Sequence, residues 1–227
     1  KNFKRSAIIF KIFADEYLSF LGELNETGYI SIPSGNHDLS RISINRTDEE
    51  IITALAFVLT IKSVPFIYYG DEIGMRYIKG LSKDGGYDRT GSRTPMQWNN
   101  QKNKGFSIAD ATYLPVHFDE RYTVENQNNL SNSILSYCKE LIKLRKTHSA
   151  LSADSTIKFV SGYEDDILIY SRKSSDEEVM IFLNCKGIKK SIAHKNKNFS
   201  VLSSLNAKVD NQTIEFNNAG YIIVSLG

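Results

Sequence analysis

The amino-terminal part of the chain alternates between helical and strand-like spacing of its hydrophobic positions. Between residues 5 and 24, apolar side chains recur every three or four positions, which predicts an amphipathic helix. The side chains on its apolar stripe are Ile9, Phe13, Tyr17, Phe20, Leu21 and Leu24. Residues 29–33 follow as a short β-like run, and the residues Ser34-Gly35-Asn36 end it. The opening pattern therefore predicts a helix and then a strand.

A second helix and a second strand follow in the same order. Thr47 and Glu50, three positions apart, form the pattern of a capping box, and the two acidic residues between them suit the positive end of a helix dipole. Helical spacing then continues to Lys62. The run 64–69 is mostly apolar and ends at Gly70, which predicts a strand buried on both faces, as in a parallel sheet. This alternation is typical of an α/β fold.

The middle of the chain has a different composition. Residues 79–129 are polar and rich in glycine, and the stretch is too long for an ordinary loop, so we expect local structure or function in it. Ser131 is then predicted to cap a helix that continues to Arg145.

The last part of the chain reads as a small all-β domain. From residue 156 onward, short β-rich runs alternate with turn residues. The runs are 157–160, 167–171, 179–183, 199–202, 213–216 and 221–225. We place the domain boundary near Ala150, which predicts domains of 1–150 and 151–227.

Composition limits the partners that we expect. The 227 residues carry a formal net charge of +2 with Lys and Arg spread along the chain, so neither nucleic acid nor a membrane is an expected partner. No apolar run approaches the roughly 20 residues needed to span a bilayer. The chain does not begin with Met, which fits a segment of a longer protein, and its localisation, cytoplasmic or secreted, stays open. Cys138 and Cys185 favour two buried free thiols over a single bridge.

Two polar segments follow the predicted strands, at the position where a β/α barrel carries its catalytic groups. They are Asn36-His37-Asp38 and Asp71-Glu72. Each could simply turn the chain after a strand. Alternatively, the carboxylates could form the nucleophile and acid of a retaining glycosidase, whose two carboxyl groups lie about 5–5.5 Å apart. The other histidines are scattered along the chain, which argues against a metal site built on His37.

Several segments resemble the α-amylase family of glycoside hydrolases. Residues 34–41 (SGNHDLSR) resemble the last of the family's active-site motifs, and residues 65–75 (PFIYYGDEIGM) resemble its eighth barrel strand with the loop that follows. Residues 93–98 (RTPMQW) resemble a segment of its α-glucosidase, oligo-glucosidase and trehalose-synthase-like branches. The helix with 141–146 (LIKLRK) resembles the last helix before the family's C-terminal β-domain. The order and spacing also match the family.

The resemblance implies an α/β plus all-β fold. Residues 1–150 would be the last strands and helices of a (β/α)₈ TIM barrel, and residues 151–227 would be a C-terminal antiparallel β-sandwich. The family's nucleophile and general acid belong to motifs on the fourth and fifth barrel strands, and neither motif occurs in this sequence. The chain alone is therefore expected to be inactive. The strand edge that faces the absent sixth strand could permit self-association.

The resemblance also assigns roles to residues. The family cleaves or transfers α-glucosidic bonds with retention of configuration, and its third carboxylate stabilises the transition state through the sugar hydroxyls. Asp38 matches this carboxylate, and Asn36, His37 and Arg41 are expected to bind the substrate. Arg41 could instead brace Asp38 through a charge-assisted hydrogen bond. Trp98 fits a structural plug better than a sugar-stacking platform.

Asp71 and Glu72 match none of the family's three catalytic carboxylates. We therefore reject the pair as acid and nucleophile, and we expect both side chains to hold the loop after the second strand.

The expected parent protein is a hydrolase or transglycosylase with an α-glucan or oligosaccharide substrate. Three alternatives stay open: a trehalose-synthase-like isomerase, a family member that has lost its chemistry, and a non-catalytic module that binds carbohydrate or stabilises the barrel. No cofactor or metal ligand is expected in this chain, and the calcium dependence of the parent stays open.

Overall fold

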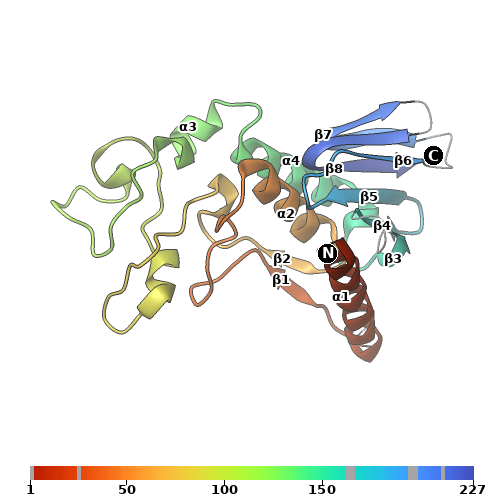
Figure 1. The fold of residues 1–227 in the computed structure, drawn as a ribbon, viewed down its shortest axis with the longest axis horizontal. Coiled ribbons are helices and arrows are strands. Elements are labelled where there is room, and N and C mark those ends of the chain that lie inside the picture. The colour runs from red at the N-terminus through yellow and green to blue at the C-terminus, as the bar shows by residue number, and fades with distance from the viewer. Residues whose placement is uncertain (1–2, 25–26, 162–166, 194–198, 211–212) are drawn as a thin grey trace. The chain divides into compact units, whose positions relative to one another are not determined.

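The computed structural model in Figure 1 describes residues 3–24, 27–161, 167–193, 199–210 and 213–227. The chain groups into two compact units. The first unit comprises Lys1–Ile32, Thr53–Val64 and Leu141–Gly227, and the second comprises Pro33–Ile52 and Pro65–Glu140. All of the predicted site residues therefore belong to the second unit.

The first helix, α1, spans Phe3–Leu24 and is amphipathic, as expected. Tyr17 is buried, and its hydroxyl donates a hydrogen bond to the carbonyl of Lys62. Phe20 was expected on the apolar stripe, but its side chain is 58% exposed. Three positions rotate a helix by about 300°, which places Phe20 at the margin of the stripe that Tyr17 and Leu21 define. No helix in the described ranges is long and apolar enough to cross a membrane.

Two short strands form a parallel pair, as the sequence predicts. β1 spans Ser31–Pro33 and β2 spans Val64–Phe66. The amide of Val64 donates to the carbonyl just before β1, and the amide just after β1 donates to the carbonyl of Phe66. The bonds advance in the same direction along both strands, which identifies the pair as parallel.

The second strand is less buried than its sequence predicts. The run 64–69 was expected to be buried on both faces, yet Val64, Phe66 and Tyr69 are 37%, 57% and 38% exposed. In the described ranges β1 and β2 pair only with each other. A parallel strand is buried on both faces only where neighbouring strands and helices cover it, and two strands do not provide that cover.

The second helix, α2, spans Asp48–Thr60 and begins with the expected capping box. Thr47 Oγ1 accepts a hydrogen bond from the amide of Glu50 at 3.3 Å, and Glu50 Oε2 accepts one from the amide of Thr47 at 2.8 Å. These two bonds satisfy amides that have no partner within the helix. The helix ends at Thr60, so Lys62 lies beyond its last turn.

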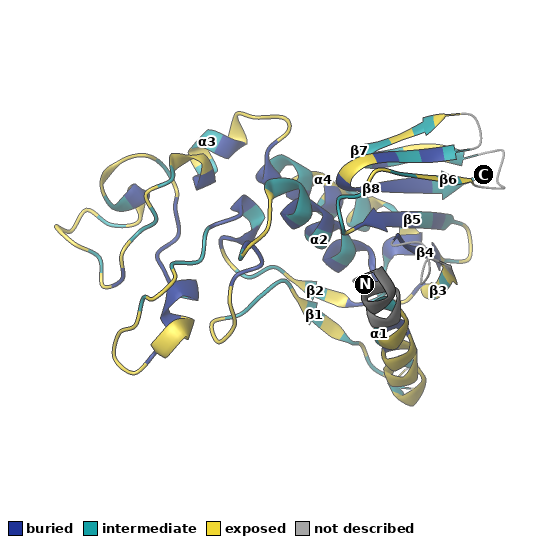
Figure 2. Ribbon diagram, in the orientation of Figure 1, coloured by how far each residue is buried: buried dark blue, intermediate teal, exposed yellow. Residues whose placement is uncertain are grey.

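The long polar segment 79–129 contains local structure, as expected, and much of it is exposed (Figure 2). It holds one short helix, α3 (Val124–Asn128), and three short 3₁₀ helices at Tyr87–Ser92, Lys102–Gly105 and Glu120–Tyr122. Gln127 anchors the segment. Its buried side chain donates to the carbonyl of Ile73 at 2.6 Å and accepts from the amide of Leu135 at 3.0 Å.

The last long helix, α4, spans Ile134–Thr147, and its cap is Ser133 rather than the predicted Ser131. Ser133 Oγ accepts a hydrogen bond from the amide of Ser136 at 3.1 Å. The carbonyl of Ser131 accepts only the hydroxyl of Ser136. Three serines stand near this helix start, and sequence spacing alone does not fix a helix boundary to within two residues.

Neither cysteine forms a disulfide, as expected, but only one of the two is buried. Cys138 lies on α4, and burial raises the pKa of its thiol to about 12. Cys185 follows a strand and is exposed. The prediction of two buried thiols is therefore wrong for Cys185.

Among the described residues after 155, six strands form one antiparallel sheet. They are β3 (Thr156–Ser161), β4 (Leu168–Lys173), β5 (Glu178–Asn184), β6 (Lys190–Ala193), β7 (Phe199–Asp210) and β8 (Thr213–Leu226). The order is β3-β4-β5-β8-β6, and β7 also pairs with β8. The predicted runs 213–216 and 221–225 belong to the single strand β8, and β6 was not predicted because it contains only one large apolar residue.

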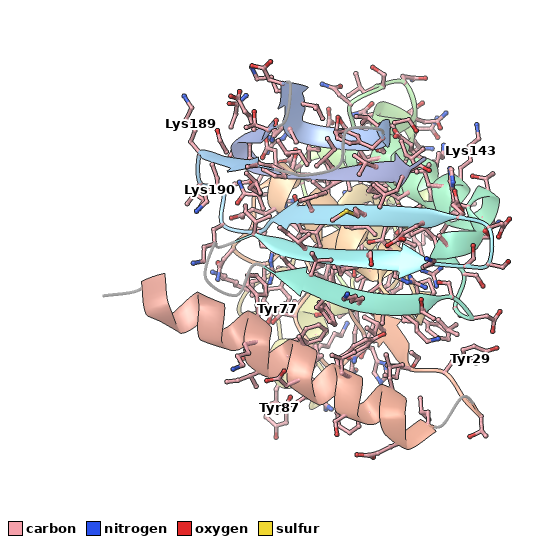
Figure 3. The ribbon with its side chains drawn as sticks, turned by 90° about the vertical axis from the view of Figure 1, so that its right-hand side faces the viewer. Tyr29, Tyr77, Tyr87, Lys143, Lys189 and Lys190 are labelled. Carbon is pink, nitrogen blue, oxygen red and sulfur yellow. The ribbon has the colours of Figure 1, made fainter. Side chains whose placement is uncertain are left out.

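Strand β8 pairs with three other strands, β5, β6 and β7, and so connects them in one sheet. Its residues 220–226 pair with β5, its residues 213–216 pair with β6, and β7 pairs along both parts. One face carries the apolar core, which comprises Ile167, Ile169, Phe182, Ile214, Phe216, Ile222 and Val224. Lys189 and Lys190 point outward beside the edge strand β6 (Figure 3), where charge disfavours pairing with another sheet. The sandwich architecture and the boundary at residue 150 stay predictions.

Candidate active site

The predicted site begins with a tight turn directly after β1. Asn36 Oδ1 accepts hydrogen bonds from the amide of Asp38 at 2.7 Å and from the amide of Leu39 at 3.0 Å. A short amide side chain that bonds to the backbone in this way turns the chain sharply. Asn36 therefore shapes the turn, and His37 and Asp38 are exposed on it.

Three cationic or potentially cationic groups surround the carboxylate of Asp38. Oδ1 accepts hydrogen bonds from Arg89 Nη1 at 3.1 Å and from Arg93 Nη2 at 3.0 Å. Oδ2 lies 3.3 Å from His37 Nε2. The Asp38 side chain remains 50% exposed, so these contacts orient the carboxylate without covering it.

The two arginines come from the polar segment between β2 and α3. Arg89 lies within the 3₁₀ helix Tyr87–Ser92, and Arg93 follows it directly. Arg93 Nε also donates to the carbonyl of His37 at 2.9 Å, so this guanidinium bonds both to the backbone and to the carboxylate of the turn. The segment 87–93 thus fixes the 36–38 turn through the hydrogen bonds of its two arginines.

Arg41 occupies a different place from the one its sequence suggests. Its side chain is fully buried, and Nη1 donates to the carbonyl of Tyr69 at 2.7 Å and contacts Asp71 Oδ1 at 3.4 Å. The rings of Tyr68 and Tyr69 flank the guanidinium. The substrate contact of Arg41 therefore stays a prediction. The alternative, a brace on Asp38, is wrong, since the guanidinium pairs with Asp71 instead.

Asp71 holds the loop after β2, as expected, and the same role for Glu72 stays a prediction. Asp71 is fully buried, and its carboxylate accepts the hydroxyl of Ser34 at 2.7 Å in addition to the contact with Arg41. Burial raises the pKa of Asp71 above its ordinary value, against the opposing effects of Ser34 and Arg41. Burial likewise raises the pKa of Glu72. The carboxylate of Asp71 does not face solvent, as a nucleophile would need to.

The sequence pattern missed Arg89 and Arg93 as site residues. Arg93 opens the RTPMQW segment, which carried the resemblance but suggested no contact with Asp38. Arg89 offered only its charge and its place in a glycine-rich stretch. Both approach Asp38 from more than 50 positions farther along the chain, a separation that spacing rules do not cover.

The structure also bears on the aromatic and metal-site expectations. Trp98 is 50% exposed, which contradicts a structural plug. Within the described residues, no group of three or more His, Cys, Asp or Glu side chains could hold a metal ion.

The fold and site together define a class of protein. Parallel strands alternating with helices, an exposed carboxylate after the first strand and a following antiparallel sheet are features of β/α-barrel enzymes with a C-terminal β-domain. This chain belongs to the α-amylase family, because residues 4–154 match the family model described as "Alpha amylase, catalytic domain".

Its relatives include a maltase and a trehalose synthase. The chain is 30% identical over 154 residues to Maltase A2 of Drosophila melanogaster, covering 66% of this chain and 27% of the relative. It is 33% identical over 147 residues to trehalose synthase of Thermus thermophilus, covering 62% and 14%. The solved trehalulose synthase MutB of Pseudomonas mesoacidophila MX-45 has the same fold, with a TM-score of 0.79 at 20% identity over 89% of this chain and 44% of that one. The chain thus spans about a quarter or less of these two curated relatives.

Proposed function

We propose that this chain is the C-terminal part of a retaining glycoside hydrolase that acts on α-glucosidic bonds of starch, maltooligosaccharides or related α-glucans. The observation that carries the proposal is the carboxylate of Asp38, which is half-exposed while Arg89 and Arg93 orient one of its oxygens. A carboxylate held in this way can accept hydrogen bonds from sugar hydroxyls. Bonds that shorten as the ring flattens stabilise the transition state more than the substrate.

The neighbours of Asp38 have separate roles in this proposal. The exposed imidazole of His37 binds the same sugar, and Asn36 acts through the turn that presents both side chains. Arg41 acts indirectly, because it fixes Asp71 and the loop after β2. Asp38 is the transition-state stabiliser, and it neither attacks the sugar nor protonates the leaving group.

The proposal holds that the chain by itself does not hydrolyse glucosides. Retention of configuration requires a nucleophile and an acid about 5–5.5 Å apart. Asp71 is buried and hydrogen-bonded, so it does not serve as the nucleophile or the acid. Turnover of a nitrophenyl α-glucoside by the purified chain at the rate of an intact maltase would overturn this part of the proposal.

Sugar binding tests the role of Asp38 separately from turnover. In an NMR titration with maltose, we expect Asp38→Asn to weaken binding, because an amide oxygen accepts a hydrogen bond less strongly than a carboxylate. Asp110→Asn is the matched control, since Asp110 is fully exposed and pairs only with Lys102 among the described residues. Equal binding by the two variants would contradict the proposed role.

A second candidate is an isomerase that transfers the glucosyl unit within one substrate. The match to trehalose synthase favours it. The test uses the longer protein that contains this sequence, incubated with maltose. Trehalose as the main product supports the isomerase, and glucose as the main product supports the hydrolase.

A third candidate is a non-catalytic module in which the antiparallel sheet of residues 156–226 binds glucan or stabilises the barrel. The sheet with its own apolar core supports a stabilising role. Retention of the chain on insoluble starch, unaffected by Asp38→Asn, would favour this candidate over the enzymes.

The proposal includes no metal or cofactor within this chain and allows self-association through β1 and β2. Exposed Val64 and Phe66 support self-association, because an uncovered strand pair can accept another strand. Light scattering over a range of concentrations tests it. Thermal melting with and without a chelator tests whether the chain holds a structural metal. We expect the melting temperature to be unchanged.

A further inference from the structure

A pocket in the second unit, lined in part by cationic side chains, lies apart from the residues around Asp38. Its volume is about 400 Å³, and it lies between the segments 43–47 and 76–79. These segments follow β1 and β2, and loops at the carboxyl ends of the last two strands of a β/α barrel frequently form phosphate sites. The side chains that line it include Arg46, Arg76 and Lys79, and no acidic residue lines it.

Arg76 is the fixed positive charge of this pocket. Its Nη1 donates to the carbonyls of Ser43 at 3.4 Å and Arg46 at 3.1 Å, and its Nη2 bonds to Asp48 and Tyr122. Asp48 offsets this one charge. The other two cations, Arg46 and Lys79, have no carboxylate partner among the described residues, which leaves the pocket with an excess of about two positive charges.

Arg46 and Lys79 also keep unused hydrogen-bond donors. Arg46 Nη1 donates a hydrogen bond to the carbonyl of Ile42 at 2.8 Å. The other two nitrogens of this guanidinium, Nε and Nη2, have no partner in the described part of the chain. Lys79 Nζ donates to Asn45 Oδ1 at 3.2 Å. Asn45 adopts a φ of 53°, a conformation that Asn tolerates better than most residues, and it thereby holds the ammonium beside the pocket.

We propose that this pocket binds a phosphate group, either as inorganic phosphate or as the phosphate ester of a sugar. The planar fork of Arg46 matches two phosphate oxygens, Lys79 supplies a point charge, and Arg76 adds a fixed field. Tyr77 also lines the pocket, and an aromatic side chain is suited to contact with the sugar of an ester. The proposal does not depend on the role of Asp38.

The helix that starts nearby is not the source of the expected affinity. The first turn of α2 is acidic, with Asp48, Glu49 and Glu50, and the capping box occupies the amides of Thr47 and Glu50. An anion would therefore be repelled by the helix start. Binding must depend on the cationic side chains, which makes the proposal testable by substitution.

The test is isothermal titration of the full chain with inorganic phosphate, glucose 6-phosphate and glucose at neutral pH. We expect both phosphates to bind and glucose to fail. The double variant Arg46→Gln/Lys79→Gln should weaken phosphate binding by at least about tenfold, because it removes the unused charged donors. The matched control is Lys143→Gln, an exposed lysine on α4 in the first unit.

The outcomes separate the possibilities. Tighter binding of glucose 6-phosphate than of phosphate identifies a sugar phosphate as the ligand, and equal binding identifies the phosphate group alone. Equal weakening by Lys143→Gln and by the double variant would overturn the proposal, since it would indicate non-specific attraction. The double variant removes the bond between Arg46 and the Ile42 backbone, so it could also disturb the fold. The single variant Lys79→Gln keeps that bond, and the proposal requires that this variant also weakens phosphate binding.

Discussion

Arg93 and Asp38 stand 55 positions apart in the chain, and a hydrogen-bonded ion pair joins them, with 3.0 Å between Arg93 Nη2 and Asp38 Oδ1. The same guanidinium bonds to the carbonyl of His37 through Nε. Arg93 therefore fixes both the backbone of the turn and the direction of its carboxylate.

This relationship predicts the effect of removing Arg93. Arg93→Ala should loosen the 36–39 turn while leaving global stability nearly unchanged, because the ion pair is partly exposed. Hydrogen exchange of the amides of Asp38 and Leu39 should accelerate by up to about fivefold, which corresponds to about 1 kcal/mol. Arg121→Ala, which breaks the ion pair between the exposed Arg121 and Asp119, is the control and should leave these amides unchanged.

The buried pair of Arg41 and Asp71 predicts a much larger effect on stability. Asp71→Asn leaves the guanidinium of Arg41 buried without its charge partner and should lower the free energy of unfolding by about 3–5 kcal/mol. Urea unfolding measures the change. The double variant Arg41→Met/Asp71→Leu should recover part of the loss, because it removes both charges. If the double variant is no more stable than Asp71→Asn, the pair is not the cause.

His117 predicts a pH dependence of stability. Burial lowers the pKa of its imidazole, and its Nδ1 accepts a hydrogen bond from the amide of Asp119 at 3.2 Å, which requires the neutral ring. The unfolded chain therefore binds more protons than the folded chain just below the ordinary pKa of about 6.5. Its contribution to stability should be fully present above that pH, and it should be lost as the pH falls below 6.5 and through the lowered pKa of the folded state.

Urea unfolding between about pH 7.5 and pH 5 tests the role of His117. His117→Asn keeps an acceptor for the Asp119 amide but does not titrate in this range. The variant should lose part of the acid sensitivity of the original chain. An identical pH profile for both chains would show that another group is responsible.

The buried Arg172 predicts a stability effect within the first unit. Its guanidinium is fully buried and bonds to the carbonyls of Thr60 and Thr156 and to the hydroxyl of Ser155. Burial lowers the pKa of Arg172 to about 10, so the side chain stays charged at neutral pH. Arg172→Met should lower the free energy of unfolding by about 3 kcal/mol or more, because several buried acceptors lose their donor.

The control for Arg172 is Lys143→Met, which removes an exposed cation of the same unit and should change stability little. A loss of stability as large in the control as in Arg172→Met would show that net charge, rather than the buried bonds, matters.

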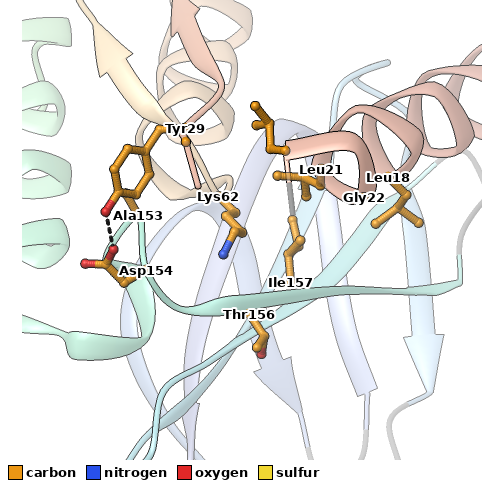
Figure 4. A pocket seen from close by; sticks show the side chains of 11 residues that line it. Leu18, Leu21, Gly22, Tyr29, Lys62, Ala153, Asp154, Thr156 and Ile157 are labelled. Carbon is orange, nitrogen blue, oxygen red and sulfur yellow. Dashed lines mark hydrogen bonds between the residues drawn. The ribbon is translucent and has the colours of Figure 1, made fainter. Parts of the chain in front are cut away.

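Gly22 predicts a stabilising substitution. It lies inside α1, and a Cβ at this position would meet no atom within 4 Å. Figure 4 shows the residue beside Leu18 and Leu21 at a pocket of about 520 Å³. Gly22→Ala should raise the free energy of unfolding by about 0.5–1 kcal/mol, because alanine restricts the unfolded chain.

Gly220 provides the opposite case. A Cβ at Gly220 would clash with the carbonyl oxygen of Leu205 on the neighbouring strand β7. Gly220→Ala should therefore destabilise the sheet. Thermal melting tests both predictions: Gly22→Ala should raise the melting temperature, and Gly220→Ala should lower it.

Much of the local structure could be predicted from residues close together in the chain. The capping box of Thr47 and Glu50, the extent of α1 and the parallel pair β1 and β2 follow from signals that act within a few positions. Motif comparison rejects Asp71 and Glu72 as a catalytic pair, and the burial of Asp71 agrees with this. Boundaries were less predictable, as the cap at Ser133 shows, because several serines offered the same local bond.

The roles of the three arginines depended on the tertiary structure. In sequence, Arg41 lies three positions from Asp38 and was the natural partner, yet it is buried against Asp71, 30 positions away. Arg89 and Arg93 take its place at Asp38 from more than 50 positions away. Sequence by itself determined that Asp38 ends a turn after a strand and which family motif surrounds it. Only the packing of distant segments decided which charge is buried and which stays exposed, because burial depends on what covers a side chain and not on its neighbours in the chain.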